Sequence, residues 1–95
     1  MGTTVGLVHL ELNVAQAMSL KDKRRVLKSL KDRLGRAHNV SVAEVDHMDK
    51  PRWAVLAVTM VGNDKHYLES ALQKIVNTAS RQREMVLVNH ETEWL

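Results

Sequence analysis

Two acidic residues and a histidine that lie close together could do chemistry near the middle of the chain. Asp46, His47 and Asp49 fall within four residues, and carboxylates with an imidazole can bind a divalent metal. The same residues are also common turn formers at the end of a hairpin. The spacing alone therefore does not predict a metal site, and we expect a polar turn.

A second group could form only if two strands pair in the right register. His9 and Glu11 alternate along one apolar segment, and His90 lies in another near the C-terminus. Side chains two residues apart in a strand share a face, so neighbouring strands could bring the three together for acid–base or metal chemistry. The register cannot be read from the sequence, so we assign no catalytic or metal-binding residues.

The strongest chemical signal is a concentration of basic residues between 19 and 36, SLKDKRRVLKSLKDRLGR. Eight Lys or Arg and two Asp give this stretch a charge of +6, whereas the whole chain carries +3. The rest of the chain is therefore −3. A basic element in an otherwise acidic protein is typical of a surface that binds phosphate or another polyanion.

The same stretch has the pattern of a helix that packs on a core. Ser19 precedes Asp22 by three residues, which predicts an N-terminal cap. Gly35 is the expected C-terminal stop. Four leucines fall on one side at 100° per residue: Leu20, Leu27, Leu30 and Leu34.

The charged side of this helix supplies the candidate phosphate contacts: Lys21, Lys23, Arg24, Arg25, Lys28 and Arg36. Lys23 is unusual because its direction lies within about 40° of the leucine side. We expect it to extend past the helix end into solvent rather than to meet a buried acceptor. An ordinary solvated helix face, with pairs such as Lys28 and Asp32, is the alternative interpretation.

The remaining segments predict one ferredoxin-like domain over residues 1–95. Four segments have the patterns of strands and a second helix is expected after Asn63 or Asp64, as follows: strands at 5–14, 39–47, 53–61 and 84–94, and a helix to about Ser80. The order βαββαβ in a compact domain gives a four-stranded antiparallel sheet in the order 4-1-3-2, with two helices on one face.

The segment 53–61, WAVLAVTMV, is apolar on both faces, which predicts a central strand with a second covered face. Either Ala54, Leu56 and Val58 or Val55, Ala57 and Val61 face the helices, and the sequence does not say which. The side away from the helices could bind a partner or a second copy of the chain. The candidate interface residues are Trp53, Val55, Leu56 and Val58.

Several functional classes lack their required residues. There is no cysteine, which excludes disulfides, thiolate metal sites and cysteine catalysis. Residues 13–19 contain no glycine for a phosphate-binding loop, and only three aromatic residues are available to stack bases. No apolar run approaches the roughly 20 residues of a membrane span, and the N-terminus does not resemble a signal peptide. We expect a cytoplasmic protein without cofactors.

Three segments together resemble the YlxP family, small bacterial proteins classed as a domain of unknown function. They are SLKDKRRVLKSL at 19–30, NVSVAEVDHMD at 39–49 and the terminal ETEWL. The resemblance implies the ferredoxin-like fold, a cytosolic bacterial origin, and genes that often lie beside those of translation initiation and ribosome maturation factors. It implies no established activity and no catalytic residues.

These observations favour a small, non-catalytic protein that binds RNA or the ribosome through its basic helix. Ribosomal RNA or the small ribosomal subunit is the expected partner. The alternative is a protein–protein interaction module or a homodimeric scaffold that uses the open side of the sheet.

Overall fold

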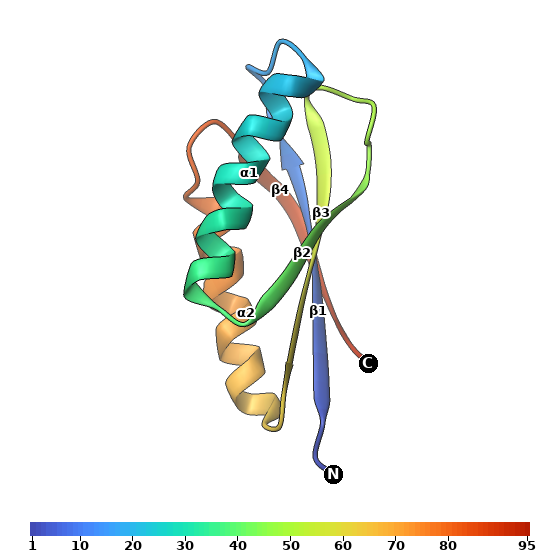
Figure 1. Ribbon diagram of the computed structural model, residues 1–95, viewed down its shortest axis with the longest axis vertical. Helices are drawn as coiled ribbons and strands as arrows, with labels where there is room; N and C mark the ends of the chain where they lie inside the picture. The colour runs from blue at the N-terminus through green and yellow to red at the C-terminus, as the bar shows by residue number, and fades with distance from the viewer.

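The computed structural model describes all 95 residues, which form an elongated α+β domain of 47 × 20 × 19 Å (Figure 1). The element order is βαββαβ, as the sequence predicts. The elements are β1 (Thr4–Asn13), α1 (Leu20–Ala37), β2 (Val40–Asp46), β3 (Trp53–Gly62), α2 (Lys65–Ser80) and β4 (Val86–Trp94).

The four strands form one antiparallel sheet in the order β2-β3-β1-β4. Read from the opposite edge, this is the predicted order 4-1-3-2. The segment 53–61 is confirmed as a central strand, because β3 pairs with β2 on one side and with β1 on the other. Neither α1 nor α2 combines the length and the apolar composition that a membrane-spanning helix needs.

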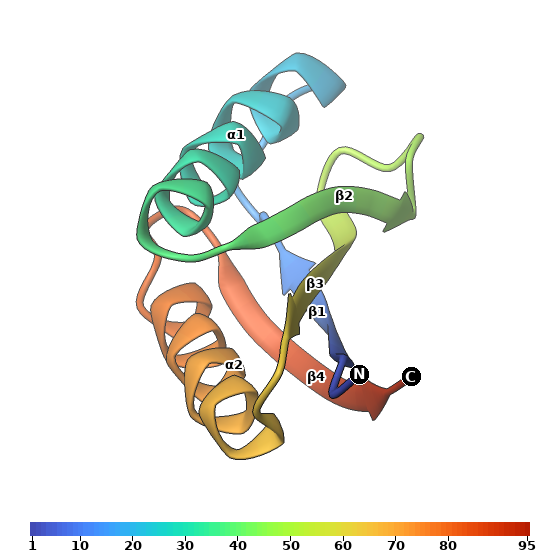
Figure 2. The same cartoon turned by 60° about the horizontal axis from the view of Figure 1, so that its bottom comes forward.

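The core lies between the sheet and the helices, and Figures 1 and 2 show α1 and α2 on the same side of the sheet. Alternate residues of the two central strands point into it and are fully buried, since strand side chains alternate between faces. These residues are Val8, Leu10, Leu12, Ala54, Leu56 and Val58. The helices contribute Leu27, Leu30, Leu34, Leu68, Leu72 and Ile75. We call the side of the sheet without helices the open face.

Helix α1 begins as the sequence predicts. The backbone N–H of Asp22 donates to Ser19 Oγ at 3.1 Å, and Asp22 Oδ2 accepts from the backbone N–H of Met18 at 3.0 Å. These bonds satisfy the N–H of Asp22 in the first turn and the N–H of Met18 just before the cap. The predicted stop at Gly35 is wrong by two residues, because this glycine keeps a negative φ and the helix continues to Ala37.

Helix α2 also begins at a predicted cap. Asp64 Oδ1 accepts from the backbone N–H of His66 at 3.0 Å and from that of Tyr67 at 3.4 Å. Strand β4 begins at Val86 rather than at residue 84. Glu84 has a φ of 67°, a left-handed conformation that a strand cannot contain.

Gly6 lies where Leu72 and Trp94 approach the backbone of β1. A Cβ at this position would lie 2.8 Å from Leu72 Cδ1 and 2.9 Å from Trp94 Cζ3, so both side chains would have to move. We therefore expect Gly6→Ala to lower the free energy of unfolding by about 1–3 kcal/mol, as measured by urea denaturation. Gly35→Ala is the matched control, because its Cβ meets nothing within 4 Å and alanine favours a helix by about 1 kcal/mol. Changes of the same sign in the two variants would contradict this account.

Candidate phosphate-binding surface

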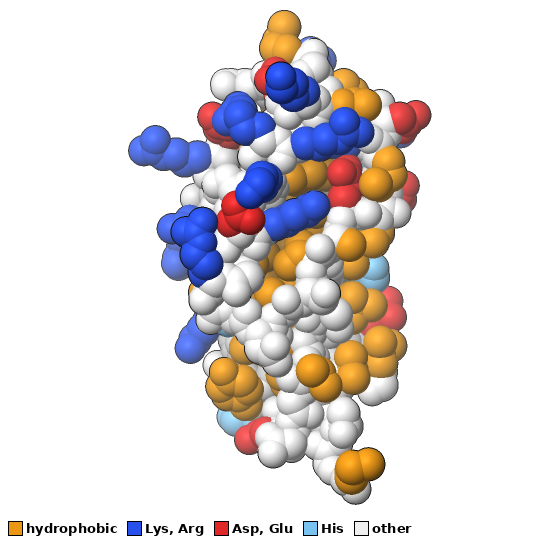
Figure 3. All heavy atoms as spheres, viewed as in Figure 1, with side chains coloured by type: hydrophobic (Ala, Val, Ile, Leu, Met, Phe, Trp, Pro, Cys, Tyr) orange, Lys and Arg blue, Asp and Glu red, His pale blue; other side chains and the backbone are white.

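Five of the six predicted phosphate contacts are exposed on one side of the molecule. We call them the basic face of α1: Lys21, Arg24, Arg25, Lys28 and Arg36. Figure 3 shows the Lys and Arg side chains gathered over α1. The leucine side of the same helix is turned to the sheet, which leaves the opposite arc to solvent.

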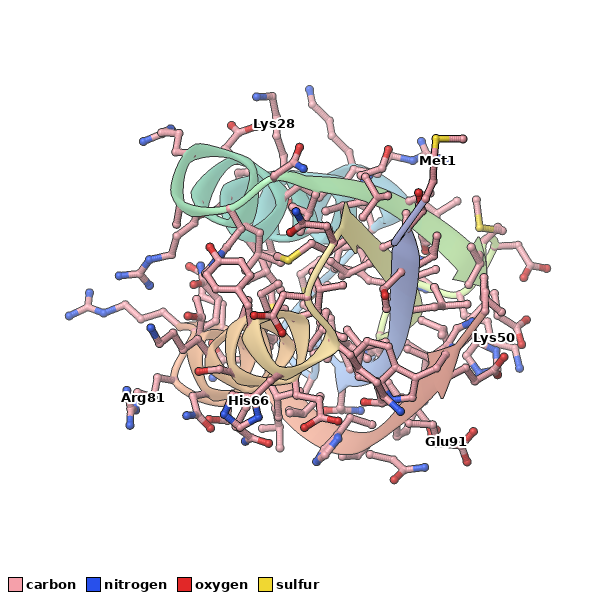
Figure 4. The ribbon with its side chains drawn as sticks, turned by 90° about the horizontal axis from the view of Figure 1, so that it is seen from below. Met1, Lys28, Lys50, His66, Arg81 and Glu91 are labelled. Carbon is pink, nitrogen blue, oxygen red and sulfur yellow. The ribbon has the colours of Figure 1, made fainter.

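The basic face belongs to a wider separation of charge between the layers. The four strands contain no Lys or Arg, and they carry five acidic residues: Glu11, Glu44, Asp46, Glu91 and Glu93. All 14 Lys and Arg of the chain therefore lie in the helices and in the connections between elements. In Figure 4, Lys28 and Arg81 lie on the helix side, whereas Glu91 lies on the sheet side.

Lys23 is the sixth predicted contact, and the structure contradicts it. Its side chain is 0% exposed, so it can neither reach solvent nor touch a phosphate. The prediction that it extends past the helix end is wrong because acceptors for its ammonium group are available inside the fold. A buried charge of this kind is tolerated only when it is paired and hydrogen-bonded.

The Lys23 ammonium meets three oxygens. Its Nζ donates to the backbone carbonyls of His47 at 2.9 Å and Trp53 at 3.1 Å, and it lies 2.7 Å from Glu44 Oε2. Glu44 Oε2 forms no hydrogen bond of good geometry, but its distance from the Lys23 ammonium is that of a close ion pair. Lys23 thus ties the start of α1 to both ends of the β2–β3 connection.

The group of Asp46, His47 and Asp49 forms a turn rather than a ligand set. His47 adopts a left-handed φ of 57°, and its carbonyl accepts from both Lys23 and the backbone N–H of Lys50. Its Nδ1 lies 3.9 Å from Asp46 Oδ1. No three His, Asp or Glu side chains come together in an arrangement that could hold a metal. His47 therefore contributes its left-handed backbone conformation and its carbonyl oxygen to the turn.

The second candidate group is divided between the two faces of the sheet. Leu10 pairs with His90, so His90 points to the helix side, whereas His9 pairs with Glu91 on the open face. The register therefore points the two histidine side chains to opposite faces of the sheet, although both residues line one shallow hollow of about 190 Å³.

The structure leaves only two of the four predicted interface residues on the surface that was expected to bind a partner. Trp53 and Val55 lie on the open face, but Leu56 and Val58 are fully buried beneath the helices. The physical reason is the register of β3, whose residues 54, 56, 58 and 60 form the core side. The open face contains a shallow hollow of about 200 Å³ that is lined mainly by small or apolar residues: Leu7, Ser41, Val42, Ala43, Ala57 and Thr59.

The sequence analysis missed a polar groove beside α1, with a volume of about 500 Å³. It lies between α1 and the segment 81–84 that connects α2 to β4. We call it the arginine groove, because four of its eight lining residues are arginines: Arg25, Arg33, Arg81 and Arg83. The only sequence signal for this groove is the RQR at 81–83. It indicates a basic site only when the fold shows that this segment lies beside α1.

The exposed pair of Lys28 and Asp32 on α1 gives a pH-dependent prediction. Lys28 Nζ donates to Asp32 Oδ2 at 2.8 Å, and this bond, with the nearby charges of Lys28 and Arg36, lowers the pKa of the Asp32 carboxyl. Because the pKa is lowered in the folded state, the contribution to stability is present above the ordinary carboxyl pKa and is lost as the pH falls through the lowered value.

We expect an NMR titration to show Asp32 deprotonating below the usual carboxyl range in the wild type and nearer to that range in Lys28→Gln. The same midpoint in both proteins would contradict the assigned cause.

Two sequence comparisons relate this chain to known proteins. A family described as "Protein of unknown function (DUF503)" matches residues 5–92. The uncharacterized protein YlxP of Bacillus subtilis (strain 168) is 28% identical over 90 residues, which cover 95% of this chain and 98% of that protein.

Two solved structures show the same fold at low sequence identity. A C-terminal segment of the alpha subunit of aIF2 from Pyrococcus abyssi has a TM-score of 0.53 and 19% identity, covering 100% of this chain and 51% of that one. The de novo designed protein LFR1 1 with ferredoxin fold also has a TM-score of 0.53, with 12% identity, and covers 96% and 82% of the two chains. The match over residues 5–92 shows that this chain belongs to the DUF503 family of proteins of unknown function.

Proposed function

We propose that the protein is a small, non-catalytic RNA-binding protein that associates with the ribosome through the basic face of α1. The observation that carries the proposal is the separation of charge. All 14 Lys and Arg lie outside the strands, and five exposed ones share one helix face. Such a surface attracts the phosphate backbone of RNA and releases its counterions.

The composition of the surface favours contacts to phosphate over contacts to bases. Helix α1 contains no aromatic residue, so it offers bases nothing to stack on. Phosphate contacts fix the position of a protein on RNA without reading its sequence. The resemblance to a family whose genes lie beside those of ribosome maturation factors favours ribosomal RNA as the source of these phosphates.

The experiment compares binding to purified small ribosomal subunits and to a generic RNA duplex at low and physiological salt. The face variant carries Lys21→Gln, Arg24→Gln and Lys28→Gln. A charge-control variant removes the same number of charges elsewhere, through Lys50→Gln, Arg52→Gln and Lys74→Gln. We expect the face variant to lose most of the binding and the charge-control variant to retain most of it. A wild-type protein that binds neither RNA at low salt would overturn the proposal.

The open face supports a second candidate function, a homodimeric scaffold. It has no cation in any strand, and Val45 and Val61 are 49% and 51% exposed. Exposed apolar surface beside a hollow is typical of a protein interface. Ala57 lies at its centre, between Ala43 and His9, so Ala57→Lys would convert a dimer to a monomer in sedimentation experiments while the basic face kept its RNA affinity. A monomeric wild-type protein at high concentration would remove this candidate.

A further inference from the structure

The arginine groove has the geometry of a binding site rather than of a uniform basic surface. Its two walls come from α1 and from the segment 81–84, and its volume of about 500 Å³ lies within the range of small-molecule sites. We propose that the groove binds an oligophosphate, meaning two or more linked phosphate groups of a free polyphosphate or of an RNA backbone. The RNA source rests on the proposed function, whereas the free polyphosphate does not.

One side chain bridges the two walls. Gln82 Oε1 accepts from Arg33 Nη1 at 3.2 Å, and Gln82 Nε2 donates to Ser29 Oγ at 3.3 Å. The backbone N–H groups of Arg81 and Gln82 bond to the last turn of α2. Both walls are therefore anchored before a ligand arrives, which reduces the entropy that binding must overcome.

The charges in the groove are largely uncompensated. Its one carboxylate, Glu84, lies 3.3 Å from Arg25. Arg33, Arg81 and Arg83 form no ion pair with a carboxylate. Three planar guanidinium groups on two walls can each donate paired hydrogen bonds to phosphate oxygens. Because these groups lie on both walls of a groove of about 500 Å³, linked phosphates can reach more of them than a single phosphate group can.

The lining also restricts the rest of the ligand. Val26 is the one apolar residue of the eight, and none is aromatic. A nucleobase would have no surface to stack on, so recognition rests on phosphate alone. The groove thus favours a chain of phosphates over a free nucleoside.

Changing Glu84 tests the proposal through an expected gain in affinity, whereas changing the arginines should cause a loss. The φ of 67° at Glu84 is uncommon for a residue with a side chain, and it brings a carboxylate to Arg25 that an incoming phosphate must displace. Glu84→Gln removes the competing charge, so the proposal requires this variant to bind oligophosphate more tightly than the wild type. Asp49→Gln, on the β2–β3 turn, is the control because it removes one negative charge outside the groove. If only net charge mattered, Glu84→Gln and Asp49→Gln would raise the affinity for oligophosphate equally.

The experiment measures tripolyphosphate binding to the full chain by calorimetry. The groove variant carries Arg33→Gln, Arg81→Gln and Arg83→Gln, and its control is the variant with Lys50→Gln, Arg52→Gln and Lys74→Gln, which has the same change in charge. We expect the groove variant to raise the Kd by about tenfold or more, and the control variant to change it by less than about threefold. Thermal unfolding checks both folds. If the groove variant is unstable, Arg81→Gln with Arg83→Gln is used instead, because it keeps the hydrogen bonds of Gln82 and the ion pair of Glu84 to α1.

The outcomes separate this inference from the proposed function. Equal effects of the groove variant and its control variant, or no tripolyphosphate binding by the wild type, would overturn the groove as a site. Tripolyphosphate binding without RNA binding would retain the site and reject the proposed function. Competition between tripolyphosphate and RNA would identify the RNA backbone as the source, whereas independent binding would identify a free polyphosphate.

Discussion

Replacing Lys23 with methionine is expected to lower the free energy of unfolding by about 3–5 kcal/mol, the usual cost of breaking a buried ion pair. The substitution preserves the length of the side chain but removes its charge. It would leave Glu44, 9% exposed, without its counter-charge, and the Trp53 carbonyl without its Lys23 donor. Small domains have about 5–15 kcal/mol of stability in total, so urea denaturation should detect the loss easily.

Lys28→Met is the matched control for this prediction. It breaks an ion pair on the same helix, but the Lys28 and Asp32 side chains are 74% and 42% exposed. Water and salt screen an exposed pair of this kind, so we expect a much smaller loss of stability than in Lys23→Met. The double variant Lys23→Met/Glu44→Leu should be more stable than Lys23→Met, because it no longer buries an unpaired carboxylate. Similar losses in Lys23→Met and Lys28→Met would show that Lys23 is not the buried tie described above.

The second large effect concerns binding. Reversing three charges of the basic face, with Lys21→Glu, Arg24→Glu and Lys28→Glu, should weaken binding to an RNA duplex at least about a hundredfold at low salt. The reason is that attraction to three phosphates becomes repulsion. Lys23 is unchanged, so the contacts that anchor α1 to the β2–β3 connection remain. Fluorescence anisotropy with labelled RNA provides the measurement.

The control for this charge-reversed protein also reverses three charges, with Lys50→Glu, Arg52→Glu and Lys74→Glu. These residues are exposed and lie outside α1, so we expect a loss of less than about tenfold, from the change in net charge alone. Comparable losses in the two charge-reversed proteins would mean that net charge, rather than the basic face, governs RNA binding.

The element order and strand order followed from the sequence because local signals agreed with one another. Ser19 and Asp64 are capping residues whose hydrogen bonds involve only their own first turns. The leucine side of α1 is fixed by helical periodicity, and the apolar character of β3 on both sides identified a central strand. Each of these signals depends on residues close together in the chain, so a single sequence contains them.

The candidate site was harder to predict because it depends on contacts between distant segments. Lys23 lay in an unexpected direction, but its acceptors His47 and Trp53 are 24 and 30 residues away. Arg33 and Gln82, which hold the arginine groove together, are 49 residues apart. The face of β3 depended on the register with β1, which turned Leu56 and Val58 toward the helices. Periodicity gives the relative direction of side chains along one element but not their partners on another.

The central claim is that the basic face of α1 binds RNA phosphates, and the salt dependence of binding tests it most directly. The measurement is the slope of log Kobs against log salt concentration for an RNA duplex, in the wild type and in variants with one, two and three of Lys21, Arg24 and Lys28 replaced by Gln. We predict that the slope becomes shallower by about 0.9 for each residue removed. A slope that stays the same across the series would contradict the claim.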